Sequence, residues 1–327
     1  MSSVLITGAG GFIGRRVVAA MDDAGWEVRP LVRKAGSVKS SRTITHDLLA
    51  SLDDVPSSDW VFHLAGAYAG AGATELRDAD LAIAQNLVRW GVSSGVKNWI
   101  FASAAEVYGE ITGFAAENSP TVPVIPYGQT KLEIERLLLQ ELGKLPGYRL
   151  VILRIGEVYG SGSKLLTELT ARLNRGFCPW PGSGNVILSF VHVDDVAAAF
   201  LCAAQNAREG AAIYNIGDDA ASTWREFLLY VARCCQNKSP QFLPLSLVKA
   251  YAVISTVAHR LTGRRDPVLT LHALRLITTP KLLSSVRAKR ELQFRPRYPD
   301  YLSGLEEALR GLSHDTQNGK AQAGASR

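Results

Sequence analysis

Cysteine is scarce in this chain, and its four copies are not placed as a metal site or a disulfide framework would need. They stand at positions 178, 202, 234 and 235, without a CxxC pair or a cluster with histidine at zinc spacing. The first residues, MSSVLITGAG, also lack the charged and then apolar segments of a secretory signal. These absences predict free thiols, no metal ion and a reducing, cytoplasmic location.

Long apolar runs and basic stripes are also missing. The most apolar segment, residues 246–261, is interrupted by a lysine, a histidine and an arginine, so no integral membrane segment is expected. It is interpreted as a packed helix of a lobe, a helix on a membrane surface, or the lining of an apolar pocket. The net charge of +6 comes from scattered residues, which argues against a nucleic-acid partner and suits a phosphorylated dinucleotide.

What is present is a regular alternation of apolar runs with helical patterns through the first half of the chain. The alternation predicts βαβ units, and nearly continuous apolar strands predict a parallel sheet covered on both faces. The expected fold is therefore a doubly wound α/β sheet of the Rossmann type with a smaller mixed C-terminal substrate lobe. The strands that carry this prediction are VLIT at 4–7, WVFHLA at 60–65, NWIFAS at 98–103 and RLVILR at 149–154.

Three segments follow from this pattern. Residues 1–160 are predicted to form a dinucleotide-binding Rossmann domain. Residues 161–313 are predicted to form mainly the substrate lobe, with some elements returning to the sheet. The polar, small-residue tail at 314–327 is predicted to be disordered.

A glycine-rich turn follows the first predicted strand and opens a helix. In TGAGGFIG, Gly8 permits a tight turn, Gly11 lets the backbone approach a pyrophosphate, and Gly14 lets helix and strand pack closely. The N–H groups at the helix start, around Phe12 and Ile13, would then face the phosphates. This context predicts a dinucleotide-binding site.

The end of the second predicted strand bears on the choice of dinucleotide. NAD-preferring sites place a carboxylate there to hold the ribose 2′-hydroxyl, but this chain has Arg33 and Lys34. Guanidinium and ammonium groups suit a 2′-phosphate, so NADP is predicted and NAD remains the alternative.

Several short motifs recur in a fixed order along the chain. They are TGAGGFIG at 7–14, DL at 47–48, HLAG at 63–66, VYG at 107–109, YGQTK at 127–131, LRIGEVYG at 153–160 and SFVHVDDVA at 189–197. Their order resembles that of the extended short-chain dehydrogenase/reductases, the group that contains the NAD-dependent epimerases and dehydratases, over roughly residues 3–310. The resemblance implies that Asp47 and Leu48 lie near the adenine, that Leu64, Ala65 and Gly66 line the cofactor cleft, and that the chain forms a homodimer through helices 76–94 and 127–143.

Tyr127 and Lys131 are the predicted chemical centre. Because residues four apart share one face of a helix, the phenol and the ammonium can meet the same small space. A nearby ammonium favours the phenolate, so Tyr127 can exchange a proton with a substrate oxygen while hydride moves to or from nicotinamide. The resemblance adds that Lys131 holds the nicotinamide ribose.

The hydroxyl that the family uses beside this pair is out of place. Its position holds Ala104, and the preceding residue is Ser103. Neighbouring strand residues point to opposite faces, so Ser103 is a candidate only with a local twist. Otherwise another hydroxyl or a water supplies the donor, or the protein has weak or no redox activity.

Three further positions narrow the substrate. The acidic pair of the family's dehydratases is reduced to Glu106, and the asparagine and arginine of its nucleotide-sugar members are replaced by Glu157 and Leu188. The close group His192, Asp194 and Asp195 is interpreted as helix capping rather than a metal site. The prediction is an NAD(P)-dependent oxidoreductase for a secondary alcohol or ketone of a small, largely apolar molecule. The alternatives are a nucleotide-sugar epimerase and a catalytically weak NAD(P)-binding sensor or structural protein.

Overall fold

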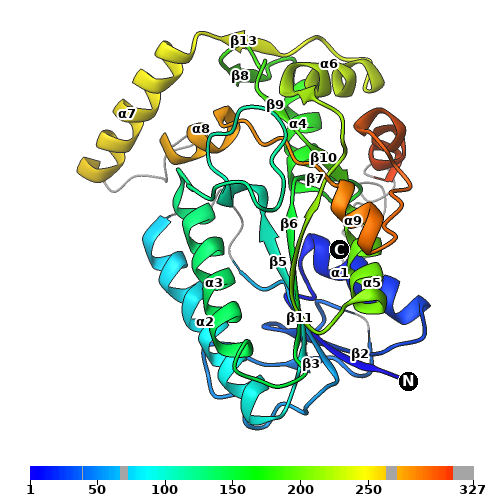
Figure 1. Ribbon diagram of the computed structural model, residues 1–327. Helices are drawn as coiled ribbons and strands as arrows, with labels where there is room; N and C mark the ends of the chain where they lie inside the picture. Colours follow the sequence, from blue (N-terminus) through cyan, green and yellow to red (C-terminus); the bar gives the residue numbers. More distant parts are fainter. Residues whose placement is uncertain (39, 67–72, 263–270, 312–327) are drawn as a thin grey trace, which may run out of the picture.

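A seven-stranded parallel sheet forms the centre of the computed structural model, which describes residues 1–38, 40–66, 73–262 and 271–311 (Figure 1). Its strand order, β11-β6-β5-β4-β1-β2-β3, reverses direction between β1 and β4, which confirms the predicted doubly wound sheet. The strands are β1 (Ser3–Thr7), β2 (Glu27–Val32), β3 (Ile44–Thr45), β4 (Trp60–His63), β5 (Asn98–Ala104), β6 (Arg149–Ile155) and β11 (Gly210–Ile216).

Helices cover both faces of this sheet. The apolar side chains of each strand point alternately to one face and to the other, so both faces need to be covered. Val4 and Ile6 of β1 pack toward α1 (Phe12–Asp23), α5 (Val193–Asn206) and α9 (Val286–Glu291). Between them, Leu5 packs toward α2 (Ala73–Ser93) and α3 (Pro126–Leu142) on the other face. The apolar side chains therefore form two cores, one on each side of a shared sheet.

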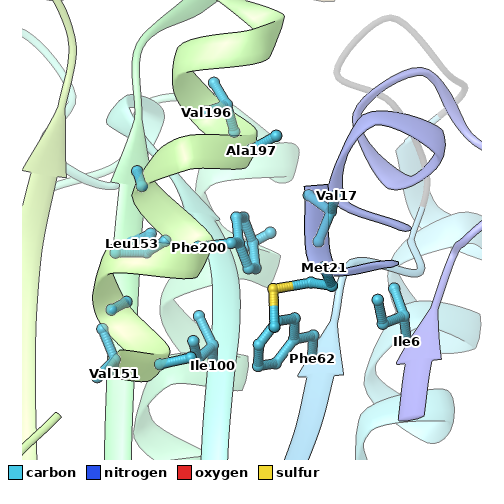
Figure 2. Packing of buried hydrophobic residues seen from close by; sticks show 14 of the residues in the cluster. Ile6, Val17, Met21, Phe62, Ile100, Val151, Leu153, Val196, Ala197 and Phe200 are labelled. Carbon is cyan, nitrogen blue, oxygen red and sulfur yellow. The ribbon is translucent and has the colours of Figure 1, made fainter. Parts of the chain in front are cut away.

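Figure 2 shows the core beneath α1 and α5. Phe62 of β4 and Phe200 of α5 lie with their ring centroids 5.6 Å apart, and Met21 of α1 fills the space beside them. All three side chains are completely buried. This packing fixes α1, and with it the glycine turn that precedes α1, against the carboxyl ends of the central strands.

The second half of the chain supplies both sheet elements and a smaller lobe. β11 pairs with β6 in the main sheet, whereas a separate aromatic core is built around Phe190 and Phe227, whose rings stack at 4.4 Å. The other elements are η1 (Ala105–Val107), β7 (Glu157–Tyr159), α4 (Lys164–Asn174), β8 (Pro179–Pro181), β9 (Ile187–Leu188), β10 (Phe190–His192), β12 (Ser222–Thr223), α6 (Trp224–Cys234), β13 (Gln241–Leu243), α7 (Leu245–Thr262) and α8 (Leu271–Thr278). Residues 301–311 are also helical.

The apolar segment 246–261 falls within α7, at the outer edge of the lobe (Figure 1). Val248 and Ala252 are buried, whereas Leu247, Tyr251 and Ile254 on the other side are more than half exposed. Within the described ranges, no helix combines the length and the apolar character needed to cross a membrane. The predicted tail 314–327 lies outside the described residues, and the predicted domain boundaries stay predictions.

Candidate active site

A cavity of about 610 Å³ opens at the carboxyl ends of the central strands. This is the edge where the order of a doubly wound sheet reverses and where such folds bind ligands. The predicted phosphate-binding residues line this cavity. They are Gly8, Gly11, Phe12, Ile13 and Gly14. These residues thus lie together at one end of the sheet, and their contacts with a cofactor stay predictions.

The glycine turn has the geometry of a phosphate cradle. Gly8 has a φ of +69°, and a Cβ added at Gly14 would lie 2.2 Å from the carbonyl oxygen of Gly8. α1 begins after Gly11, has no side-chain cap and carries no acidic residue in its first turn. Its free N–H groups and partial positive charge therefore face the cavity, which fits the diphosphate of a dinucleotide.

Thr7 fixes the strand end opposite this turn. Its hydroxyl accepts hydrogen bonds from the N–H groups of Leu64 and Ala65, both at 3.2 Å. The same hydroxyl lies 3.0 Å from Nδ1 of His63, and burial lowers the pKa of His63 to about 3. His63 is therefore a neutral structural group, and it holds the turn that brings Leu64 and Gly66 to the cavity.

Tyr127 and Lys131 meet in the middle of the cavity wall. Nζ of Lys131 lies 5.7 Å from the centre of the Tyr127 ring and donates to the carbonyl oxygen of Ala102 at 2.9 Å. A Cβ at Gly128 would lie 2.4 Å from the carbonyl oxygen of Glu106, so the first turn of α3 packs directly on η1. This close packing places the phenol beside Glu106.

The pKa values of Tyr127 and Lys131 reflect more than their interaction with each other. Burial, together with the carboxylates of Glu106, Asp80 and Glu157, raises the pKa of Tyr127 above its ordinary value. Burial also lowers the pKa of Lys131 to about 8. The phenol is therefore neutral at ordinary pH.

Ser103 belongs to a buried ion-pair network. Its hydroxyl donates to Oε1 of Glu135 at 2.5 Å, and Glu135 forms two hydrogen bonds with Arg154, at 3.0 and 2.7 Å. Ser103 and Ala104, which stands where the family usually has its hydroxyl residue, both line the cavity. Ser103 as a substrate donor stays a prediction, and its proton is donated to Glu135 in this structure.

A second ion-pair cluster lies on the lobe side of the phenol. Nζ of Lys281 is 2.9 Å from Oε1 of Glu106 and 3.1 Å from Oε2 of Glu157. Leu188, in contrast, is completely buried in the aromatic core of the lobe and does not face the cavity. The two substrate-side carboxylates that the sequence singled out are thus joined by a lysine from a distant segment.

Comparison with known proteins decides the family. The model of the NAD dependent epimerase/dehydratase family matches residues 4–217. The chain belongs to this family. It is 25% identical to the UDP-glucose 4-epimerase of Azospirillum brasilense, over 98% of this chain and 95% of that protein. It is also 25% identical, over 98% and 97%, to the 4-hydroxy-2-methyl-3-oxo-4-farnesyl-3,4-dihydroquinoline-1-oxide ketoreductase of Stigmatella aurantiaca.

Solved structures give the same fold. The UDP-glucose 4-epimerase of Thermotoga maritima, solved with UDP-glucose, matches with a TM-score of 0.78 at 21% identity, over 96% of this chain and 99% of that one. The UDP-glucose 4-epimerase of Thermus thermophilus, solved with NAD, matches with a TM-score of 0.75 at 24% identity, over 95% and 99%. Members of this family use NAD(P) as cofactor.

Not every residue assigned to the cofactor in this epimerase/dehydratase chain faces the described cavity. Arg33 is exposed just after β2, and the Asp47 carboxylate accepts from the N–H of Leu49. Leu48 is buried in the core beneath α2 and α3, and Ala65 contributes its N–H to Thr7. These four residues lie outside the cavity wall, and their contacts with a cofactor stay predictions.

Sequence reasoning missed several residues that contact the cavity-lining residues from behind. Ser37 packs on the glycine turn, because a Cβ added at Gly10 would lie 2.9 Å from the Cβ of Ser37. The Ser37 hydroxyl donates to the carbonyl oxygen of Lys34. Glu135 carried a usable signal, because it stands four residues after Lys131 on the same helix face. Lys281 carried none, since its partners are 175 and 124 residues away.

Replacing Gly11 by Asp is expected to weaken cofactor binding at least about tenfold, because the new carboxylate would oppose the diphosphate at the start of α1. The fold should survive, because Asp is a favourable N-cap and, among the described residues, a Cβ at Gly11 would closely approach one atom, the carbonyl oxygen of Gly8 at 3.1 Å. Titration of reduced-cofactor fluorescence measures the affinity. Gly11→Asn caps the helix without a charge and should retain more affinity than Gly11→Asp; equal losses would contradict the electrostatic reason.

Proposed function

We propose that this chain is an NAD(P)-dependent oxidoreductase for a secondary alcohol or ketone of a small, largely apolar substrate. The observation that carries the proposal is that the glycine cradle, Tyr127 and Lys131 line one cavity. A dinucleotide with its diphosphate at Gly11 would extend along this cavity toward the phenol. A cytoplasmic location and a homodimer through α2 and α3 belong to the same proposal.

In this proposal the cofactor, Lys131 and Tyr127 each have a separate role in the reaction. When bound, the cofactor supplies or accepts the hydride, and its oxidised nicotinamide ring brings positive charge into the cleft. Lys131 would hold the ribose of a bound cofactor and would stabilise negative charge on Tyr127. Tyr127 accepts the hydroxyl proton during oxidation and returns a proton to the oxygen during reduction. The raised pKa of Tyr127 makes it a proton donor before charge enters the cleft.

The substrate side of the cavity supports a small and largely apolar molecule. Val158, Leu165 and Leu276 line it from β7, α4 and α8. Glu106 and Glu157 line the cavity on this side, and Lys281, which bonds both of them, offsets only one of their two charges. A second diphosphate placed beside these two carboxylates, in addition to that of the cofactor, would meet repulsion.

A nucleotide-sugar epimerase is the second candidate, because relatives that cover nearly the whole chain are UDP-glucose 4-epimerases. Both activities use the same cofactor, but only the oxidoreductase changes its redox state after a full turnover. Purified protein is therefore incubated with a panel of secondary alcohols or with UDP-glucose, and cofactor absorbance and products are followed. Net cofactor reduction with an alcohol supports the first function. Formation of UDP-galactose without net cofactor change would replace it with the second.

NADP is the proposed dinucleotide because Arg33 and Lys34 follow β2 without a carboxylate. Replacing Arg33 by Ala is expected to weaken NADPH binding about tenfold or more and to leave NADH binding within about twofold, since only NADPH carries the 2′-phosphate. Fluorescence titration with each reduced cofactor gives the two affinities. Arg15→Ala, an exposed arginine within α1, is the control. An equal effect on both cofactors would count against a 2′-phosphate contact.

A further inference from the structure

Lys281 is a buried cation that reaches the substrate side of the cavity from the C-terminal part of the chain. Its side chain is 2% exposed, and its backbone is bonded to β9 by the N–H to the carbonyl oxygen of Ile187 at 3.0 Å. Its carbonyl oxygen accepts from the N–H of Ser189 at 2.7 Å. With the backbone fixed on both sides, Nζ is held at one point between Glu106 and Glu157.

Lys281 holds the carboxylates of Glu106 and Glu157 in place, and both residues still face the cavity. Burial alone would lower the pKa of Lys281, but Glu106 and Glu157 outweigh it and raise the pKa above its ordinary value, so the lysine is charged. The side chains of Glu106 and Glu157 are 11% and 25% exposed, and both line the cavity, whereas Lys281 does not. Across the part of the chain that the structure describes, Lys281 is the only donor bonded to either carboxylate.

The cluster therefore presents one uncompensated negative charge and free acceptor oxygens to the substrate. Ionised carboxylates accept hydrogen bonds and cannot donate them. A hydroxyl or an ammonium satisfies these oxygens, while an anion at the same place meets repulsion in a partly desolvated wall. Because Glu106 lies directly against the turn that carries Tyr127, this discrimination acts beside the reacting carbon.

We propose that Glu106 and Glu157, positioned by Lys281, select substrates whose polar group next to the reacting carbinol is a hydrogen-bond donor without negative charge, and reject substrates with an anion there. The inference rests on the proposed function and names its substrate class: amphipathic molecules with a hydroxyl or ammonium beside the carbinol and an apolar remainder. The apolar remainder would contact Val158, Leu165 and Leu276.

Three ring alcohols that share one cyclohexanol frame test the proposal on the full chain loaded with its reduced cofactor, whose nicotinamide is neutral and does not oxidise them. They are trans-1,2-cyclohexanediol, trans-2-aminocyclohexanol and trans-2-hydroxycyclohexanecarboxylate, and their dissociation constants are measured by saturation-transfer NMR titration. The diol and the amino alcohol are expected to bind at least about tenfold more tightly than the hydroxy acid. Equal or tighter binding of the hydroxy acid, or no detectable binding of the other two at tens of millimolar, would overturn the proposal.

Two variants separate this cluster from the general acidity of the cavity. Glu157→Gln keeps the size of the side chain and removes the uncompensated charge, so the preference over the hydroxy acid should shrink at least about threefold. Glu168→Gln is the control, because Glu168 lines the same cavity but is half-exposed and lies near Lys164 instead. The preference should persist in this variant, and an unchanged preference in Glu157→Gln contradicts the role of the cluster.

The failure of this inference is distinct from a failure of the proposed function. Cofactor titration and alcohol oxidation by the unmodified protein test the function alone. A protein that binds the cofactor and oxidises alcohols, but does not distinguish the three ring compounds, would retain the function and lose the selectivity inference.

Discussion

Replacing Tyr127 by Phe is expected to lower turnover by roughly 10²–10⁴-fold, the range that general acid–base catalysis contributes. The variant removes one oxygen atom from a side chain that lines the cavity beside Lys131 and leaves the ring in place. Cofactor affinity should therefore change by less than about threefold, because the glycine cradle and Lys131 are untouched. Steady-state kinetics with the alcohol that the wild-type chain oxidises, combined with a cofactor titration, measures both quantities.

The matched control is Tyr148→Phe. Tyr148 lies in the connection between α3 and β6, next to the amino end of that strand and so at the opposite edge of the sheet from the cavity. This variant should retain full turnover. A Tyr127→Phe protein with unchanged turnover would rule out phenol proton transfer and would leave cofactor binding as the function of the cleft.

The pH profile of the same reaction carries independent information. Burial and three carboxylates raise the pKa of Tyr127, which opposes the lowering that a nearby ammonium was predicted to produce. Loss of a proton from this phenol is therefore unfavourable at low pH. Oxidation should consequently be more sensitive to low pH than reduction, because oxidation needs Tyr127 as the base.

Local sequence patterns predicted those parts of the site that lie on single elements. The turn at Gly8 to Gly14 and the pair Tyr127 and Lys131 depend on spacings of three or four residues, which strand–turn–helix geometry and one helical turn translate directly into space. The sheet was predictable for a similar reason: apolar strands that alternate with helices leave few ways to cover both faces.

The polar networks behind the site were not predictable in this way. Arg154 meets Glu135 across a strand and a helix, and Lys281 reaches Glu106 over 175 positions in the chain. No local period links such residues, because the contacts exist only after the lobe has packed on the sheet. The direction of the Ser103 hydroxyl followed from one of these networks, so its donation to Glu135 could not be read from the strand alone.

Replacing Arg154 by Met is expected to lower the free energy of unfolding by about 3–5 kcal/mol, the cost of leaving one member of a buried ion pair without its partner. The side chains of Arg154 and Glu135 are 4% and 2% exposed, and two hydrogen bonds join them. The Arg154 guanidinium also lies 4.8 Å from the ring centre of Tyr108, so the variant loses that contact as well. Urea unfolding followed by tryptophan fluorescence measures the change.

Two further variants test whether the unpaired buried carboxylate causes this loss of stability. The double variant Arg154→Met/Glu135→Leu removes both charges of this pair, so stability should return to within about 2 kcal/mol of the wild type, with the residual loss from the freed Ser103 hydroxyl. Arg77→Leu breaks the half-exposed pair between Arg77 of α2 and Glu133 of α3 and should cost about 1 kcal/mol or less. If the double variant is no more stable than Arg154→Met, the loss comes from packing and not from the unpaired carboxylate. Because Glu135 lies one turn after Lys131 on α3, the single variant should also loosen the helix face that carries the reaction, and turnover should fall with stability.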